Sequence, residues 1–264
     1  MTAWLLKDVP SWLLLPGLIV LISGGAVLIQ RYVRNRFPGL KGDTHNEVMR
    51  FVFTVIAVLY AFLSGFMINA LWGQINAADA RAAVEGSTGM QQAKSLTVFD
   101  EADSDRIRQR LLEYERAAVA EWPLVASGQT QPEAEMVLHA LYTAYQEVQP
   151  RNDVQSKFLA ISLNNLDKMS AARTERITLA RTATGPPFPL WAVNFVIGTM
   201  LLGSGIIFGG TQSAFNHMMV AAMGVLIASV LFVIAEMSHP YLGEIATSPE
   251  SLCQVVAFLS PSPA

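Results

Sequence analysis

The sequence contains a single cysteine, Cys253, and lacks the short motifs of common enzymes. One cysteine excludes an intrachain disulfide and a cage of several cysteines, and we expect Cys253 to be a small buried residue. No H-E-x-x-H, G-x-S-x-G or P-loop pattern occurs. The histidines lie in four separate segments, at His45, His139, His217 and His239. The sequence therefore gives no positive support for an enzyme, a cofactor or a metal site.

Charge is also scarce. Only 15% of the 264 residues are charged, whereas a soluble domain carries about 25%. The net charge of −3 gives no indication of nucleic-acid binding. Instead, 52% of the residues are hydrophobic and the mean hydropathy is +0.36. These hydrophobic residues are concentrated in blocks, which is typical of an integral membrane protein.

Four blocks are long enough to cross a bilayer, which needs about 20 apolar residues in a helix. They are Trp12–Ile29, Phe51–Trp72, Leu190–Phe208 and Met218–Met237. Each is uncharged except for Glu236 near the end of the fourth. No A-x-A cleavage site follows the first block, so we expect an uncleaved anchor. The fold class predicted is all-α, with four transmembrane helices.

Small residues within these blocks predict close helix–helix packing. They are Gly24 and Gly25 in the first block, and Gly205 and Gly209 at the end of the third.

Residues 73–189 have a different composition, with 12 of the 18 basic and 15 of the 21 acidic residues. They predict a helical extramembrane insert between the second and third spans. Span two has no helix breaker between Trp72 and Gly86, so we expect one long helix that continues into the insert. Pro123 and Gly128 predict a break, and Thr130 with Glu133 predicts a capping box.

Apolar residues at spacings of three and four predict three helical stripes in the insert. They are Ile107, Leu111, Tyr114, Ala118 and Trp122; Val137, Leu138, Leu141, Tyr142, Tyr145 and Val148; and Val154, Phe158, Ile161, Leu166 and Met169. We expect Glu113, Glu115 and Glu121 to lie on a solvated helix face. The predicted organisation is an N-terminal segment 1–11, spans one and two with a basic loop at 12–72, the insert at 73–189, spans three and four at 190–237, and a C-terminal turn and short helix at 238–264.

Charge does not decide the membrane orientation. The loop 30–50 carries five basic residues, and Lys7 with four arginines near the ends of the insert gives five on the other side.

Several short stretches resemble one known family. They are His45-Asn46-Glu47, Val58 to Phe66, Trp72-Gly73-Gln74, Glu85, Glu121-Trp122-Pro123, Leu190-Trp191 and His239-Pro240-Tyr241-Leu242-Gly243. In this order, from about residue 45 to 256, they resemble the bacterial bestrophin-like membrane family and, more distantly, the bestrophin ion channels. One position departs from the pattern: Ser238 stands where the family usually has an acidic residue, and Glu236 is a candidate for that role, tethering the turn at His239, Pro240, Tyr241 and Gly243.

The resemblance implies a pentameric channel whose second span lines the pore. Val58, Phe62 and Phe66 stand where those channels have three bulky apolar residues before a Gly-Phe step, and Asn69 follows on the same face. A spacing of four rotates by about 40° per step, so these residues share one helix face. The alternative is that they simply pack against neighbouring helices or lipid.

The resemblance also implies a homo-oligomer in the cytoplasmic (inner) membrane of a bacterium, with a cytoplasmic insert. A second hypothesis is a non-conducting scaffold or regulatory protein whose helical insert binds a partner. The aromatic pairs Tyr114/Trp122 and Tyr142/Tyr145 would then be partner surfaces, although core packing is the simpler interpretation.

Overall fold

The computed structural model describes residues 9–37, 46–126, 129, 131–182, 185–208 and 213–260, and these ranges contain helices but no strand. The chain forms two compact units. The first unit comprises Met1–Gly73, Thr184–Ser238 and Gly243–Ile245, and the second comprises Gln74–Ala183, His239–Leu242 and Ala246–Ala264. Helix α4 (Asn46–Ser95) contributes to both.

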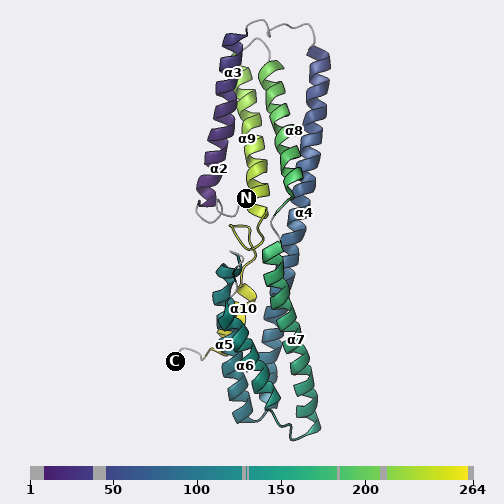
Figure 1. The fold of residues 1–264 in the computed structure, drawn as a ribbon, viewed down its shortest axis with the longest axis vertical. Coiled ribbons are helices and arrows are strands. Elements are labelled where there is room, and N and C mark those ends of the chain that lie inside the picture. The colour runs from purple at the N-terminus through teal and green to yellow at the C-terminus, as the bar shows by residue number, and fades with distance from the viewer. Residues whose placement is uncertain are drawn as a thin grey trace. The chain divides into compact units, whose positions relative to one another are not determined.

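The first unit is built from long apolar helices that run side by side (Figure 1). They are α2 (Ser11–Ile19), continued by a π-helical turn (Val20–Gly24) and α3 (Gly25–Arg36), the first half of α4, α8 (Phe188–Phe208) and α9 (Ser213–Met237). Four helices are long and apolar enough to cross a membrane, which confirms the four predicted blocks at that level. Because α9 begins at Ser213, it is five residues longer at its start than the predicted block.

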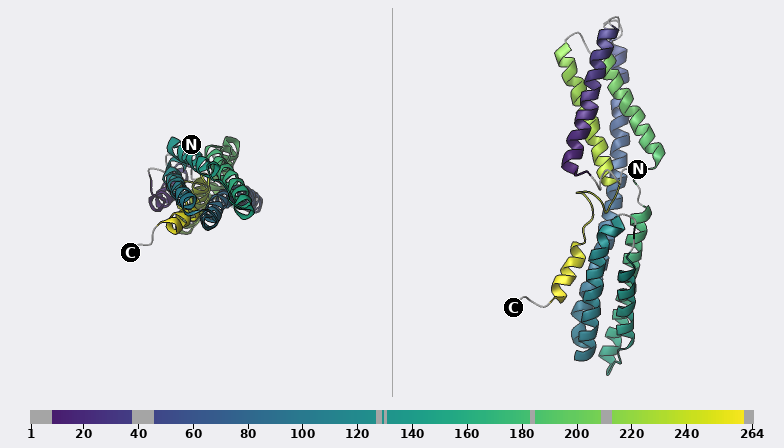
Figure 2. Two further views of the ribbon diagram at one scale, coloured as in Figure 1. Left: turned by 90° about the horizontal axis from the view of Figure 1, so that it is seen from below. Right: turned by 60° about the vertical axis from the view of Figure 1, so that its left-hand side comes forward.

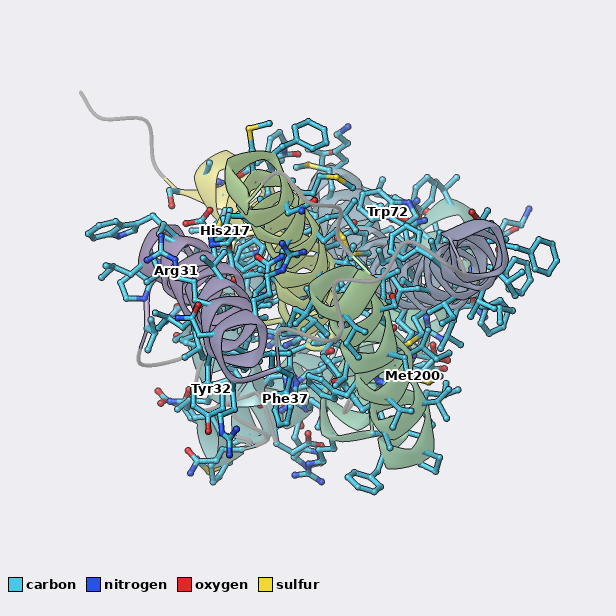
Figure 3. All side chains as sticks on the ribbon, turned by 90° about the horizontal axis from the view of Figure 1, so that it is seen from above. Arg31, Tyr32, Phe37, Trp72, Met200 and His217 are labelled. Carbon is cyan, nitrogen blue, oxygen red and sulfur yellow. The ribbon has the colours of Figure 1, made fainter. Side chains whose placement is uncertain are left out.

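Large apolar side chains cover the outside of this unit. Seen from above, Tyr32, Phe37 and Met200 project away from the helices (Figure 3), and each is at least half exposed. An apolar exterior costs free energy in water and none in lipid, so it suits a bilayer.

Helix packing in the first unit uses one of the predicted glycines and one that was not predicted. A Cβ at Gly224 of α9 would lie 2.6 Å from Ser23 Cα, and the Ser23 hydroxyl donates to the Ala221 carbonyl at 3.0 Å. A Cβ added at Gly24 or Gly25 would meet no other helix within 4 Å, so the prediction of a close approach there was wrong. Gly205 does meet Met223 across α8 and α9, as predicted, whereas Gly209 lies outside the described residues.

The second unit packs α5 (Glu101–Ala126), α6 (Pro132–Gln146) and α7 (Asp153–Thr182) against the second half of α4, with a 3-10 turn at Leu96–Val98 (Figure 2). All five residues of the first predicted stripe are buried in its core. Tyr114, Trp122 and Tyr145 are core residues, so they do not form a partner surface, and Tyr142 is partly buried beside them.

Two expectations for this unit fail, and a third falls partly outside the described residues. Pro123 does not end α5, because a proline disrupts mainly the turn before it and α5 continues only to Ala126. On α7, Val154 and Ile161 are exposed, and polar residues such as Gln155 and Ser162 turn inward instead. Helix α6 begins after Gln131 with no side-chain cap, and Thr130 and Gly128 of the predicted boundary lie outside the described residues.

Helix α4 runs without interruption past Trp72 and also past Gly86, where a break was expected. The glycine instead makes room for α10 (Glu250–Leu259). A Cβ on Gly86 would lie 2.5 Å from Ser251 Cβ, and the Ser251 hydroxyl donates to the Ala82 carbonyl at 2.8 Å. Glycine costs about 1 kcal/mol in a helix interior, so tertiary packing outweighs the local preference here.

Candidate functional site

Helix α4 has one buried and one exposed face within the first unit. Tyr60, Ser64, Met67 and Leu71 are buried, and at 3.6 residues per turn they fall within about 60° of helix circumference. The predicted pore residues lie about 180° away from them. Val58 is 62% exposed, Phe62 75% and Phe66 59%, and Asn69 is exposed as well. The structure therefore brings these four onto one helix face that no other described part of the chain covers.

Polar contacts on the buried side fix the rotation of α4. The Ser64 hydroxyl donates to Asn194 Oδ1 of α8 at 3.0 Å, and both residues are buried. A Cβ at Gly198 of α8 would lie 3.3 Å from the Tyr60 ring, so this glycine lets the ring pack against α8. These contacts orient the exposed face away from the rest of the unit.

A cleft of about 470 Å³ runs along one flank of α4, between this helix, α8 and α9. Its α4 side includes the small residues Ala57, Ala61 and Gly65 between larger ones, and Leu201 and Met223 stand opposite. Small side chains at a spacing of four leave free volume on this flank of α4.

Glu236, at the end of α9, is buried and holds two segments in the first unit. The Ser11 hydroxyl donates to its Oε1 at 2.5 Å, and the Glu244 backbone N–H donates to its Oε2 at 3.3 Å. Gly243 adopts φ of 97° against the same carboxylate, a conformation that favours glycine. Ser238, which departs from the family pattern, donates instead to the Ile234 carbonyl at 2.5 Å and lies against Gly185, whose φ is 77°.

The rest of the C-terminal turn belongs to the second unit. The Leu242 N–H donates to the His239 carbonyl at 3.1 Å, and the Thr247 N–H donates to the Pro240 carbonyl at 2.8 Å. Tyr241 is buried and stacks edge-on against Trp122, with ring centroids 5.7 Å apart. Burial is the main cause that raises the pKa of Tyr241 to about 12, so its hydroxyl remains neutral.

A buried ion cluster that the sequence reasoning missed lies close to this turn. Arg176 donates from Nε to Glu85 Oε2 at 2.8 Å and lies over the Trp122 ring, 4.8 Å from its centroid. Arg173 donates from Nη2 to Glu121 Oε1 at 2.8 Å and also pairs with Glu135. The pKa of each arginine is raised by its carboxylate partners, in spite of burial, so both stay charged.

The expectation of a solvated acidic face on α5 was therefore wrong for two of its three residues. Glu115 and Glu121 are completely buried, whereas Glu113 is at the surface and pairs with Arg110. Helical spacing could have shown this. Glu115 and Glu121 each lie within about 60° of the centre of the Ile107–Trp122 stripe, and Glu113 lies about 140° away.

In the part of the chain that the structure describes, no three His, Cys, Asp or Glu side chains are arranged to hold a metal ion. His45 lies outside the described residues.

The sequence matches the bestrophin-like domain over residues 20–252, which is most of the chain. The chain belongs to the bestrophin-like family. Members of this family and fold are ion channels rather than enzymes. No curated protein has a significantly similar sequence.

Solved structures show the bestrophin fold directly. A bacterial bestrophin homologue from Klebsiella pneumoniae, solved as a single-site variant, is 13% identical and superimposes with a TM-score of 0.67 over 92% of this chain and 96% of its own. A second variant of the Klebsiella homologue is 12% identical, with a TM-score of 0.69 over 91% and 96% of the two chains. A structure described as a membrane protein is 14% identical, with a TM-score of 0.66 over 92% and 94%.

This bestrophin-like chain thus carries two groups of predicted residues in different settings. Val58, Phe62, Phe66 and Asn69 are exposed on α4, whereas Glu236 and Tyr241 are buried within their respective units. The first group is available to contact other molecules, and the second is packed inside the protein.

Proposed function

We propose that the chain forms a homo-oligomeric ion channel in the cytoplasmic membrane of a bacterium, with a hydrophobic constriction made by α4. The observation that carries the proposal is the exposed face of α4 with Val58, Phe62 and Phe66. The membership of the bestrophin-like family supports it. Several copies arranged around an axis, five in the channels that the sequence resembles, would cover this face and enclose a path between them.

A ring of phenyl groups suits a gate, because a narrow apolar constriction loses its water and then blocks ions. Asn69 would follow the ring as an uncharged polar position on the same face. The cleft beside Ala57, Ala61 and Gly65 would allow α4 to tilt and widen the ring. Residues 73–189 would form the extramembrane insert between spans two and three, on the cytoplasmic side. The remaining parts of the chain would be 1–11, 12–72, 190–237 and 238–264.

Planar-bilayer recording of the purified protein tests the proposal. We expect the wild type to carry current, and Phe62→Ala or Phe66→Ala to increase leak or opening because each shortens the apolar constriction. Phe195→Ala is the matched control. Phe195 is also exposed, on α8, but lies outside the predicted pore face and should leave the current unchanged.

Mass measurement in mild detergent provides the second arm. The proposal requires a multiple of the 28.8 kDa chain. A well-folded preparation that is monomeric, or that carries no current in any variant, would overturn it.

A further inference from the structure

Glu115 is a carboxyl group without a hydrogen-bond partner in the core of the second unit. It lies on α5, is 0% exposed, and neither of its carboxyl oxygens has a hydrogen-bond partner among the residues that the structure describes. Glu85 and Glu121 are equally buried, but each is paired with an arginine. An isolated buried carboxylate is strongly disfavoured, so Glu115 stands apart from the cluster next to it.

The C-terminal helix α10 closes the space around Glu115. Gly89 of α4 faces the Glu115 carboxyl group, and a Cβ there would collide with Oε1 and lie 3.5 Å from Val255 of α10. Leu252, Val255 and Leu259 form the buried face of α10 and join the core that contains Tyr114 and Ala118. Helix α10 is therefore one of the elements that shield this carboxyl group from water.

Among the described residues, no cation donates a hydrogen bond to Glu115, although Arg176 attracts it and has one buried donor, Nη1, without a hydrogen-bond partner. Of the charged groups that act on it, Glu85 of α4 is acidic, and Arg176 of α7 already binds Glu85. Its neighbour on α5, Tyr114, donates to Glu85 at 3.0 Å. The titratable groups of α10 are Glu250, which is exposed, and Cys253, which adjoins Arg116 in a surface hollow.

We propose that α10 is a displaceable cover whose docking onto α4 and α5 requires an uncharged Glu115, so that rising pH releases the C-terminal helix. Ionisation creates a buried charge that becomes hydrated when α10 leaves. This inference concerns the second unit and does not depend on channel activity.

The direction of the pH effect follows from linkage. Burial, and secondly Glu85, raises the pKa of Glu115 well above its usual value in the docked state, against a lowering influence of Arg176. Exposed to water, the group returns to an ordinary pKa of about 4.3. The stability that the neutral acid gives to docking is therefore fully present below about pH 4.3 and is lost as pH rises toward the docked pKa. Within that interval the released population grows by up to about tenfold per pH unit.

Cys253 is a natural reporter of docking, because it is the only cysteine and lies half-buried on α10. We would measure the rate of thiol labelling of the full-length protein in detergent between about pH 5 and about pH 9. Glu115→Gln, an uncharged side chain of the same shape, is the comparison at each pH. The wild-type rate divided by the Glu115→Gln rate should rise with pH, by up to about tenfold per unit.

Two further measurements make the test independent of thiol chemistry and of the variant. Labelling of Glu133→Cys in a Cys253→Ala background gives the intrinsic pH dependence at an exposed site on α6. Amide hydrogen exchange of the wild type is corrected for the intrinsic exchange rate at each pH. The corrected rate in α10, relative to that in α6, should then be higher at high pH. A ratio that stays constant with pH, or equal protection of α10 at both ends of the range, would overturn the proposal.

Discussion

At the residue scale, burial decides how much an ion pair contributes. Arg176 and Glu85 are both 0% exposed, whereas the pair of Arg81 and Glu175 is 34% and 60% exposed at its side chains. Removing one partner of a buried pair leaves an uncompensated charge, but exposed pairs are screened by water. Substitutions in the buried ion cluster on α4, α5 and α7 should therefore lower the stability more than substitutions in exposed ion pairs.

Arg176→Ala should therefore destabilise the protein by about 3–5 kcal/mol, because Glu85 would remain buried without its partner. Arg81→Ala, the matched change at the exposed pair, should cost at most about 1 kcal/mol. Denaturant unfolding of the detergent-solubilised variants, followed by circular dichroism, measures both. Equal losses for the two variants would show that burial does not govern the Arg176 pair.

Gly243 is sensitive for a different reason, its backbone conformation. Its φ of 97° strains any side chain, and an added Cβ would also meet the Glu236 carboxylate. Gly243→Ala should cost about 1–3 kcal/mol in the same unfolding assay. Gly203→Ala is the control, because Gly203 is helical with nothing within 4 Å and alanine favours a helix. A Gly243→Ala protein as stable as wild type would contradict the importance of this conformation.

At the scale of elements, a side-chain hydrogen bond between Ser64 and Asn194 holds α4 to α8. Ser64→Ala leaves Asn194 Oδ1 without this donor, and such interhelical bonds contribute about 0.6 kcal/mol on average. Ser204→Ala is the control, because the Ser204 hydroxyl bonds only the Leu201 carbonyl of its own helix, at 2.7 Å. We expect a lower melting temperature and altered channel opening for Ser64→Ala alone. If both variants melt at the same temperature and open alike, the hydrogen bond between Ser64 and Asn194 does not control the orientation of α4.

The elements themselves could largely be predicted from the sequence. An uncharged stretch of about 20 residues has no soluble alternative of equal stability, so the four apolar helices follow from composition. The common face of Val58, Phe62 and Phe66 follows from their spacing. The pairing of Glu121 with Arg173 could not be predicted, because 52 residues separate them and only the packing of α5 on α7 brings them together. Likewise, the sequence alone suggests that Gly86 ends a helix, because its contact with α10 cannot be seen in the sequence.

At the scale of the whole molecule, charge leaves the orientation in the membrane open. Residues 73–189 contain both the buried ion cluster and an acidic excess of three residues, and residues 30–50 include five basic ones. The positive-inside rule counts basic residues near the span ends, and it gives five on each side. Orientation must therefore be measured.

Single-cysteine labelling in intact cells measures it. In a Cys253→Ala background, Leu40→Cys marks the loop between spans one and two, and Gly128→Cys marks the insert. With a cytoplasmic insert, a membrane-impermeant reagent should label position 40 in intact cells and position 128 only after permeabilisation. Labelling of position 128 alone from outside would reverse the orientation. The insert would then face the periplasm, and α10 would respond to periplasmic rather than cytoplasmic pH.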